Sequence, residues 1–376
     1  MEILKFYKQI GKEYSIMDTM SLTAKYEDEM ITIRRHIHRH PELSNKEYKT
    51  TEFIREKLTE YGVEIAEIGM KTGVVAVIRG GKPGKTVAIR EDIDALPMKE
   101  LTGLPFASEN DGACHSCGHD IHTTVLLYCA KVLSEIRGEL AGTVMLIFQP
   151  AEEIGKGAEL CRSLIKEKHI GEIYGFHNIP GKPLGTVLVK DGTFACASTG
   201  LEIHMTGTPS HAAYPEAGRN PGYALAGLLL QIEELTKQFN ETKGFVRMTL
   251  IGMKLGSENY GVAASDGYLR LTVRSEGEQV FREYLAEIRK LAEVMAQKEA
   301  LELSIKEIER FPSTDNHAEQ VQKIRACAAS HQIPYIELPE PMHWSEDFGW
   351  YLQETKGAFF GIGDGEDYAQ LHTEHF

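Results

Sequence analysis

The segment between Asp111 and His122 holds metal-binding side chains at a density that ordinary cores, turns and surfaces do not need. Within twelve residues it contains two cysteines, three histidines and two aspartates. Thiolate, imidazole and carboxylate groups together are the ligands of borderline metals such as zinc, manganese and cobalt. The alternative is a polar loop with incidental cysteines. A metal site in this segment would need further ligands from other parts of the chain.

Polar side chains suited to metal binding or proton transfer also stand where three predicted strands end. They are Asp92 and Asp94 after strand 86–89, Glu152 and Glu153 after strand 143–148, and His177 after strand 171–176. Helical patterns at 121–136 and 156–166 alternate with these apolar strands, as is typical of a parallel α/β sheet. Since such sheets bind ligands at the carboxyl ends of their strands, the sequence predicts one site built from these residues.

The adjacent carboxylates Glu152 and Glu153 can divide two tasks between them. Neighbouring side chains in extended or turn backbone point in different directions. One carboxylate can therefore bind a metal while the other acts as a general base toward a water molecule, as amide hydrolysis requires. The competing interpretation is an acidic pair that stabilises a helix start by about 0.3–1 kcal/mol.

Three aspartates are candidates to support the metal ligands. Asp92 and Asp94 are two positions apart and face the same way in an extended strand. We expect at least one of them to accept a hydrogen bond from the second ring nitrogen of a ligand histidine and so fix its tautomer. Asp120 and His122 are candidates for the same supporting role.

Five residues form the predicted ligand set: Cys117, His119, Glu153, His177 and His372. A single catalytic zinc usually has three or four protein ligands. Five ligands suit two metals about 3.5–4 Å apart that share one ligand. We assign the shared position to Cys117, because two cations would keep its thiol deprotonated. Gly118 gives the backbone the freedom that the pairing of Cys117 with His119 needs.

Two local patterns precede these strand ends. Ser44-Asn-Lys-Glu47 has the spacing of a capping box that would open a helix running to about Tyr61. The apolar runs 73–78 and 86–89, with glycine and proline between them, predict a hairpin or two adjacent strands.

Near residue 198 the pattern changes to alternating polar and apolar residues. From there to residue 308 the predicted order is β-α-β-β-α-β, which is typical of a ferredoxin-like unit. The length of 376 residues also suits two domains. We therefore predict a catalytic α/β domain, 1–197 plus 309–376, that is interrupted by an inserted α+β domain, 198–308.

Composition and charge exclude several classes of partner. Apolar residues make up 42% and charged residues 26% of the chain, as is typical of globular proteins. The net charge of −14 argues against nucleic acid as a partner. No apolar run approaches the ~20 residues that span a bilayer, and the first residues lack the apolar region of a signal peptide. Six cysteines without such a signal predict reduced thiols and a cytoplasmic location.

Several motifs stand in order along the chain from about residue 28. They are Arg35-His-Ile-His-Arg-His-Pro-Glu-Leu-Ser44, Asp92-Ile-Asp-Ala-Leu-Pro97, His115-Ser-Cys-Gly-His-Asp120, Gln149-Pro-Ala-Glu-Glu153, Gly175-Phe-His-Asn178, Ser210-His-Ala-Ala213, Ser345-Glu-Asp-Phe348 and Leu371-His372. Together they resemble the di-metal metallopeptidase family, in the branch of amidohydrolases that contains hippurate hydrolase, indole-acetyl-amino-acid hydrolase and N-acetyl-diaminopimelate deacetylase. The resemblance covers nearly the whole chain.

The resemblance implies a phosphorylase/hydrolase-like α/β catalytic domain with an inserted ferredoxin-like α+β lid and dimerisation domain. It implies two divalent metal ions per subunit, Mn²⁺ or Zn²⁺, with Co²⁺ or Ni²⁺ as further candidates, held by the five ligands named above. It implies Glu152 as the catalytic base, with Asp92 and Asp94 in support. It also implies a homodimer formed through the lid, or a homotetramer. His211 matches a lid histidine that reaches the partner subunit's site and stabilises the oxyanion.

The lid carries two candidate substrate contacts. Arg274 matches a lid arginine that could hold a substrate carboxylate, although a surface arginine on an edge strand is an equally good interpretation. Relatives often carry Asn-Val-Ile-Pro in the lid, whereas this chain has Gly261 at the Asn position. Asn259 is the candidate replacement.

The function implied by the resemblance is metal-dependent hydrolysis of the amide bond of N-acyl amino acids, with N-acetyl, benzoyl or similar acyl groups. The products are a carboxylic acid and a free amino acid. A metallo-exopeptidase or dipeptidase of the same family, which uses the same chemistry, is the main alternative. A less favoured alternative is a redox protein in which Cys114-His-Ser-Cys117 acts as a CxxC pair at the start of a helix. A metal-binding scaffold without catalytic activity is a further, less favoured alternative.

Overall fold

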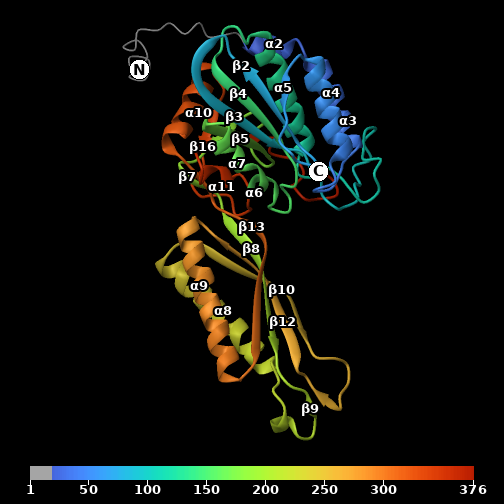
Figure 1. The fold of residues 1–376 in the computed structure, drawn as a ribbon, viewed down its shortest axis with the longest axis vertical. Coiled ribbons are helices and arrows are strands. Elements are labelled where there is room, and N and C mark those ends of the chain that lie inside the picture. Colours follow the sequence, from blue (N-terminus) through green and yellow to red (C-terminus); the bar gives the residue numbers. More distant parts are fainter. Residues whose placement is uncertain (1–18) are drawn as a thin grey trace.

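The computed structural model of the protein describes residues 19–376 (Figure 1). An eight-stranded sheet with helices on both faces occupies one end of the molecule. A four-stranded sheet with helices α8 (Gly222–Thr242) and α9 (Glu278–Lys298) occupies the other end. None of the described helices is both long and apolar enough to cross a membrane. The expectation about a signal peptide and the start of the range 1–197 concern residues 1–18, which lie outside the described residues.

The eight-stranded sheet is mixed rather than purely parallel. In spatial order its strands are β1 (Glu64–Ala66), β2 (Val74–Arg79), β4 (Ala141–Gln149), β3 (Lys82–Asp92), β5 (Ile170–Ile179), β16 (Lys356–Gly363), β6 (Val187–Val189) and β15 (Tyr335–Glu337). The central strands β4, β3, β5 and β16 are parallel, whereas β2 runs antiparallel to both β1 and β4. The parallel centre brings the carboxyl ends of β3, β4 and β5 to one edge of the sheet.

Strand β4 lies between β2 and β3 and pairs with both. The prediction that the runs 73–78 and 86–89 form a hairpin or adjacent strands is therefore wrong. The second half of β4 is buried, and its backbone groups find hydrogen-bond partners on both sides only in a central position. Proximity in the sequence did not reveal this pairing.

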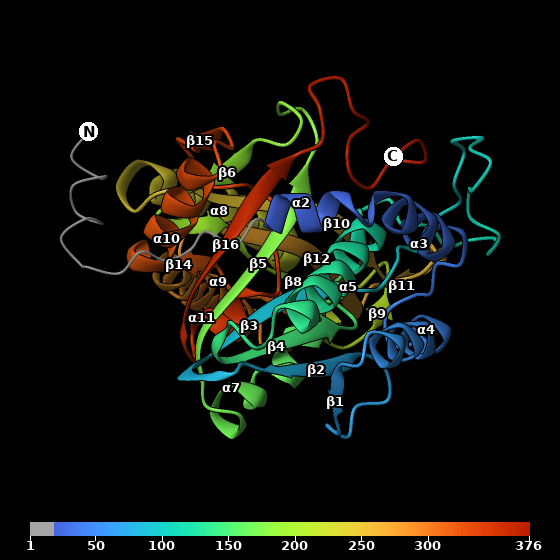
Figure 2. The same cartoon turned by 90° about the horizontal axis from the view of Figure 1, so that it is seen from above.

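Helices cover both faces of this sheet (Figure 2). On one face lie α3 (Glu27–Arg39), α4 (Tyr48–Glu60) and α5 (His119–Glu135), and on the other lie α6 (Gly157–Cys161), α7 (Ser163–Glu167) and α11 (Gly349–Leu352). Two more helices, α2 (Thr19–Ala24) and α10 (Ala318–Ser330), pack on α5 and on β16, respectively. Alternate residues of β2 face the two layers: Val74 and Ala76 join the first core, and Val75 and Val77 join the second.

The four-stranded sheet is antiparallel throughout. Its spatial order is β10 (Val246–Leu255), β12 (Asp266–Ser275), β8 (Ala197–Thr206) and β13 (Glu302–Phe311). The chain order β8-α8-β10-β12-α9-β13 matches the predicted alternation. Both helices pack on one face of the sheet. A two-stranded ribbon of β9 (Ser210–His211) and β11 (Val262–Ala263) forms its far end (Figure 1).

A second ribbon lies where the chain passes between the two sheets. It pairs β7 (Gly192–Ala195), which precedes β8, with β14 (Thr314–Asn316), which follows β13. The segment that leads into the four-stranded sheet and the segment that returns from it therefore run side by side.

Candidate metal centre

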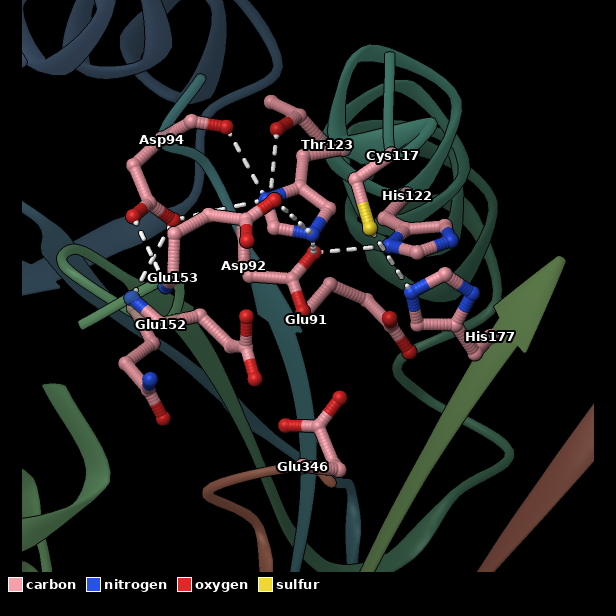
Figure 3. Close-up of polar contacts among 12 residues, drawn as sticks. Glu91, Asp92, Asp94, Cys117, His122, Thr123, Glu152, Glu153, His177 and Glu346 are labelled. Carbon is pink, nitrogen blue, oxygen red and sulfur yellow. Dashed lines mark hydrogen bonds and ion pairs between the residues drawn. The ribbon is translucent and has the colours of Figure 1, made fainter. Parts of the chain in front are cut away.

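The five predicted ligands converge where β3, β4 and β5 end. The Cys117 Sγ atom lies 3.4 Å from His177 Nε2 and 3.3 Å from His372 Nε2. The Nε2 atom of His119 lies 3.8 Å from Glu153 Oε1, and Glu153 Oε2 lies 3.6 Å from His372 Nε2. Figure 3 shows Cys117, Glu153 and His177 turned toward one another.

Cys117 belongs to two groups of potential ligand atoms. One group joins it to His119 and His177, and the other joins it to Glu153 and His372. In each group all ligand atoms lie within 4.8 Å of one another. These two groups together contain all five predicted ligands and have only Cys117 in common, which is the arrangement expected of a ligand shared between two ions.

Hydrogen bonds turn two of the histidines toward the centre. The Nδ1 atom of His119 lies 2.9 Å from the carbonyl oxygen of Asp94, and the Nδ1 atom of His177 lies 2.7 Å from that of Asn178. A carbonyl oxygen only accepts, so each Nδ1 donates its proton to the carbonyl and each Nε2 is the nitrogen that can bind a metal. Within residues 19–376, His119 Nε2 and Glu153 Oε1 are buried without a hydrogen-bond partner. A ring nitrogen and a carboxylate oxygen that face one another in this way are suitable ligands for one cation.

Negative charge is in excess around this centre. Burial, together with the carboxylates of Glu153 and Glu152, raises the pKa of Cys117 well above its ordinary value. Burial also raises the pKa of Glu153 to about 7 and that of Glu152 well above its usual range. Burial is the largest single effect on His119 and by itself lowers its pKa, but the carboxylates of Asp92, Asp94 and Glu153 together outweigh it and raise the pKa to about 10. Divalent cations would compensate this charge and favour the ionised acids.

Asp92 orients a histidine that is not among the predicted ligands. Its Oδ1 atom lies 2.6 Å from His122 Nδ1 and 3.6 Å from His119 Nε2, while its Oδ2 atom accepts a hydrogen bond from Arg90 at 2.9 Å. The Nε2 atom of His122 lies 2.7 Å from Asn178 Oδ1. Both ring nitrogens of His122 are therefore engaged, although Asp92, His119 and His122 also form a compact group of ligand atoms.

Asp94 supports two parts of the centre. Its carbonyl oxygen accepts the His119 hydrogen bond described above, as expected of a residue that fixes a tautomer. Its carboxylate accepts hydrogen bonds from the backbone N–H groups of Glu152 and Glu153, both at 3.1 Å. The Ser44 hydroxyl donates to the same carboxylate at 2.7 Å.

The prediction that Asp120 supports a ligand histidine is wrong. The Asp120 carboxylate lies 2.8 Å from His38 Nδ1 and 2.7 Å from Arg34 Nε. In the described part of the chain, no hydrogen bond or ion pair joins this carboxylate to a predicted ligand. Asp120 follows His119 on α5, but helical geometry turns successive side chains about 100° apart.

The predicted capping box at Ser44 and Glu47 is also wrong. No side chain caps α4 at Glu47, and Ser44 is engaged with Asp94. The carboxylate of Glu42 takes the expected position instead and accepts the Thr50 N–H at 2.8 Å.

Glu152 is buried beside the predicted ligands. Its carboxylate forms a group with His119 and Glu153 in which the ligand atoms lie within 4.8 Å of one another. The backbone N–H of Asp347 donates to Glu152 Oε1 at 3.3 Å. Glu152 and Glu346 point toward each other in Figure 3. A carboxylate in this position can exchange a proton with a water molecule in the centre.

Sequence reasoning missed Arg90, which is fully buried at the end of β3. Its guanidinium nitrogens lie 2.9 Å from Asp92, 3.1 Å from Glu346 and 2.7 Å from Asp347. Its Nε atom donates to Gln149 Oε1 at 2.8 Å. An arginine directly after the apolar run 86–89 was the available signal, but Asp347 lies 257 positions later in the chain.

The structure does not bring His211 or Asn259 to the centre within one chain. His211 is exposed on β9, at the end of the molecule opposite the eight-stranded sheet (Figure 1). The Asn259 Oδ1 atom accepts a hydrogen bond from the Gly261 N–H at 2.9 Å and so closes its own turn.

Arg274, by contrast, lies against a segment that lines the centre. Its Nη1 atom donates to Ser345 Oγ at 2.8 Å. The neighbouring Trp344 ring lies 5.2 Å from the His177 ring, measured between centroids. No ion pair of Arg274 is present within residues 19–376, which leaves its charge available to an anion.

The region before α5 does not have the form expected of a CxxC redox motif. Helix α5 begins at His119, after Gly118 with φ 90°, so the motif does not open the helix. A Cβ at Gly118 would overlap the Asn178 side chain. The backbone of Cys114 forms an isolated β-bridge with Leu96, and all six cysteines have free thiols rather than disulfide bonds.

Comparisons with known proteins agree with this layout. Residues 88–376 match the family model of Peptidase family M20/M25/M40. N-acetyl-L-cysteine deacetylase of Bacillus subtilis (strain 168) is 34% identical over 347 residues, covering 92% of this chain and 83% of that protein. Thermostable carboxypeptidase 1 of Saccharolobus solfataricus is 32% identical over 343 residues, covering 90% of this chain and 86% of that protein.

A solved structure also supports membership of this family. A dinuclear metal binding peptidase of the M20 family from Bacillus subtilis is 32% identical and superposes with a TM-score of 0.81, covering 94% of this chain and 92% of that chain. The family match spans more than half of the sequence and includes all five predicted ligands. The chain therefore belongs to Peptidase family M20/M25/M40 and is a hydrolase of amide bonds.

Proposed function

We propose that the protein hydrolyses the amide bond of N-acyl amino acids, with N-acetyl, benzoyl or similar acyl groups, and uses two divalent metal ions. The observation that carries this proposal is the position of Cys117, which is common to two groups of ligand atoms beside the buried Glu152. Relatives named for deacetylation of N-acetylcysteine support the substrate class.

The predicted ligands would hold the metals as two sets. His119 and His177 would hold one ion, Glu153 and His372 the other, and Cys117 would be shared. Mn²⁺ and Zn²⁺ are the first candidates, followed by Co²⁺ and Ni²⁺. When bound, such ions polarise a carbonyl oxygen and lower the pKa of a water molecule.

Glu152 would act as the base. Its carboxylate takes a proton from the attacking water and returns it to the nitrogen of the leaving amine. The Asp347 N–H holds Oε1, and Asp94 holds the backbone N–H, so the carboxylate is fixed before substrate binds. Arg274 would bind the carboxylate of the amino-acid part, which places the acyl group toward the centre.

We further propose that residues 198–308 form a lid and dimerisation domain inserted in a catalytic domain of residues 1–197 and 309–376. Strand β10 is an edge strand, and it exposes Leu250, Ile251, Met253 and Leu255. An unpaired apolar edge of this kind favours pairing with a second copy. A homodimer, or a homotetramer built from it, would allow His211 to reach the partner subunit's centre and stabilise the oxyanion. Asn259 lies in the same ribbon region and would contact substrate there only from a partner.

A reducing compartment suits the protein. All six cysteines are free, including the proposed ligand Cys117. Since oxidation would remove the thiolate ligand, we propose a cytoplasmic location.

A substrate panel would test the proposed function. N-acetyl-, benzoyl- and indole-acetyl-amino acids and dipeptides should be compared after loading with Mn²⁺, Zn²⁺, Co²⁺ or Ni²⁺, with metal content measured in parallel. We expect about two ions per chain and release of free amino acid from at least one N-acyl substrate. Dipeptides as the sole substrates would favour the exopeptidase alternative, which the carboxypeptidase relative suggests. Absence of bound metal would contradict the proposal.

A further inference from the structure

The backbone that precedes the Glu152–Glu153 pair is held in a conformation that residues with a side chain avoid. Ala151 is completely buried and has φ 56°, in the left-handed region. The Cβ atom makes this region unfavourable for alanine, so surrounding contacts must maintain it. The next two residues are Glu152, the proposed base, and Glu153, a proposed ligand. The backbone conformation at Ala151 therefore determines the direction in which both side chains leave the backbone.

Three consecutive N–H groups of this segment point at two buried carboxylates. Ala151 donates to Glu47 Oε1 at 2.9 Å. Glu152 and Glu153 donate to the two carboxylate oxygens of Asp94, as described above. Each of the three N–H groups donates to a different carboxylate oxygen, and the three bonds together leave little freedom for rotation of this segment.

Glu47 has no other evident purpose in the site. It is fully buried and reaches across from the start of α4, 104 positions before Ala151. The same Oε1 atom also accepts the Asn45 N–H at 2.9 Å, which ties the acceptor to its own turn. Burial, with a further contribution from the Asp94 carboxylate, raises the pKa of Glu47 to about 7. Because burial disfavours the ionised form of this carboxyl group, we infer that Glu47 has a role beyond the start of the helix.

We propose that Glu47 is a positioning residue, which holds Ala151 in the left-handed conformation and thereby places the Glu152 and Glu153 carboxylates in the metal centre. The proposal rests on the proposed function for its kinetic consequence. Its structural consequence, a fixed backbone at 151–153, can be measured without substrate or metal.

Kinetics of paired variants test the consequence for catalysis. Glu47→Ala removes the acceptor, and we expect kcat to fall roughly 10- to 100-fold with KM within about threefold, because displacement of a base by about 1 Å has an effect of this size. Glu47→Gln keeps an Oε1 acceptor for the Ala151 N–H and should retain most of the activity. Glu42→Ala is the matched control, since it disturbs the same end of α4 through Thr50 without touching Ala151.

A second-site change separates positioning from general loss of stability. Glycine adopts positive φ without strain, so Ala151→Gly in the Glu47→Ala background should recover part of kcat. A defect that merely loosens α4 would not respond to a change at residue 151.

Two measurements do not depend on turnover. Metal affinity, measured by titration of Zn²⁺ or Mn²⁺, should weaken about tenfold in Glu47→Ala but not in Glu42→Ala, as for other residues that orient ligands. Hydrogen–deuterium exchange of peptides covering 149–157 in the metal-free protein should become faster in Glu47→Ala alone. Unchanged exchange there would overturn the proposal whatever the enzyme's substrate is. Changed exchange in a protein that binds no metal would keep the Glu47 assignment and reject the proposed function instead.

Discussion

At the scale of single residues, the centre contains acids whose ionised form is disfavoured by burial. Positive charge close to them is needed to balance their negative charge. Glu152 is the clearest case, because burial and four neighbouring carboxylates raise its pKa well above the usual range. Within the described residues, the fully buried Arg90 is ion-paired with three of these surrounding acids. The proposed metals would supply the remaining positive charge.

Replacement of the base should separate metal binding from turnover. Glu152→Gln keeps the shape and the acceptor for the Asp347 N–H, but an amide cannot take the proton of the attacking water. We expect kcat to fall by at least about 10²-fold with metal content unchanged. Glu159→Gln, at a partly exposed residue paired with Lys156, is the control. Full activity in Glu152→Gln would rule out its role as base.

Replacement of Arg90 should lower the free energy of unfolding. Arg90→Leu leaves Asp92, Glu346 and Asp347 buried without their partner, which costs about 3–5 kcal/mol of unfolding free energy. Urea denaturation would measure this change. The exposed pair of Arg79 with Glu64 offers the comparison, because Arg79→Leu should have little effect. Equal stabilities of the two variants would contradict the importance of the buried network.

Stability should depend on pH through Glu47. Its pKa is about 7 in the folded protein against an ordinary value of 4.5, so the folded state holds this proton more tightly. The resulting stabilisation is fully present below about pH 4.5 and is lost as pH rises through about 7. Glu47→Gln has no such proton to lose, so its stability relative to the native protein should increase between about pH 5 and about pH 8, by on the order of 1–3 kcal/mol. Parallel pH profiles in urea unfolding would show that this carboxyl is not perturbed.

At the scale of elements, the centre depends on how strands and helices begin and end. Strands β3, β4 and β5 deliver Asp92, Gln149 and His177 to one edge, and α5 begins there with His119. The positive φ at Gly118 allows Cys117 and His119 to approach the same point from a turn and a helix.

A side chain at Gly118 should disturb this junction. Gly118→Ala would place a Cβ against the Asn178 side chain in a conformation that alanine avoids. We expect metal affinity to fall roughly tenfold or more, as measured by titration of the metal-free protein. Gly138→Ala, where the added Cβ meets nothing within 4 Å, should bind metal normally. Unchanged affinity in Gly118→Ala would mean that the turn adapts without moving the ligands.

At the scale of the whole molecule, the two sheets divide the tasks. The eight-stranded sheet gathers the predicted ligands and the base. The β9–β11 ribbon carries His211 at the far end of the molecule, and the four-stranded sheet exposes an apolar edge strand. If His211 takes part in the reaction as proposed, a second copy of the chain would have to supply it.

Mixing two inactive variants would test this arrangement. Glu152→Gln subunits keep His211, and His211→Ala subunits keep the base. If His211 acts across the dimer, co-expression should restore about a quarter of wild-type activity, because half of the dimers are mixed and each has one complete site. Each variant expressed alone is the control. No recovery in dimers shown to be mixed would place the action of His211 within its own chain or remove it.

The sequence by itself determined the chemistry of the centre and most of its elements. Ligand types are properties of single residues, so Cys117, His119, Glu153, His177 and His372 could be proposed from identity and motif alone. The order of strands and helices in the second half followed from short-range periodicity, which depends only on near neighbours.

Only the tertiary structure decided which segments meet. It placed β4 between β2 and β3, joined Arg90 to Asp347 across 257 positions, turned Asp120 to His38 and brought Glu47 to Ala151. Each of these contacts is made by folding of distant segments onto one another, and no local pattern specifies its partner. The sequence therefore identifies what the centre is made of, and the packing of the two helical layers on the sheet decides what holds it in place.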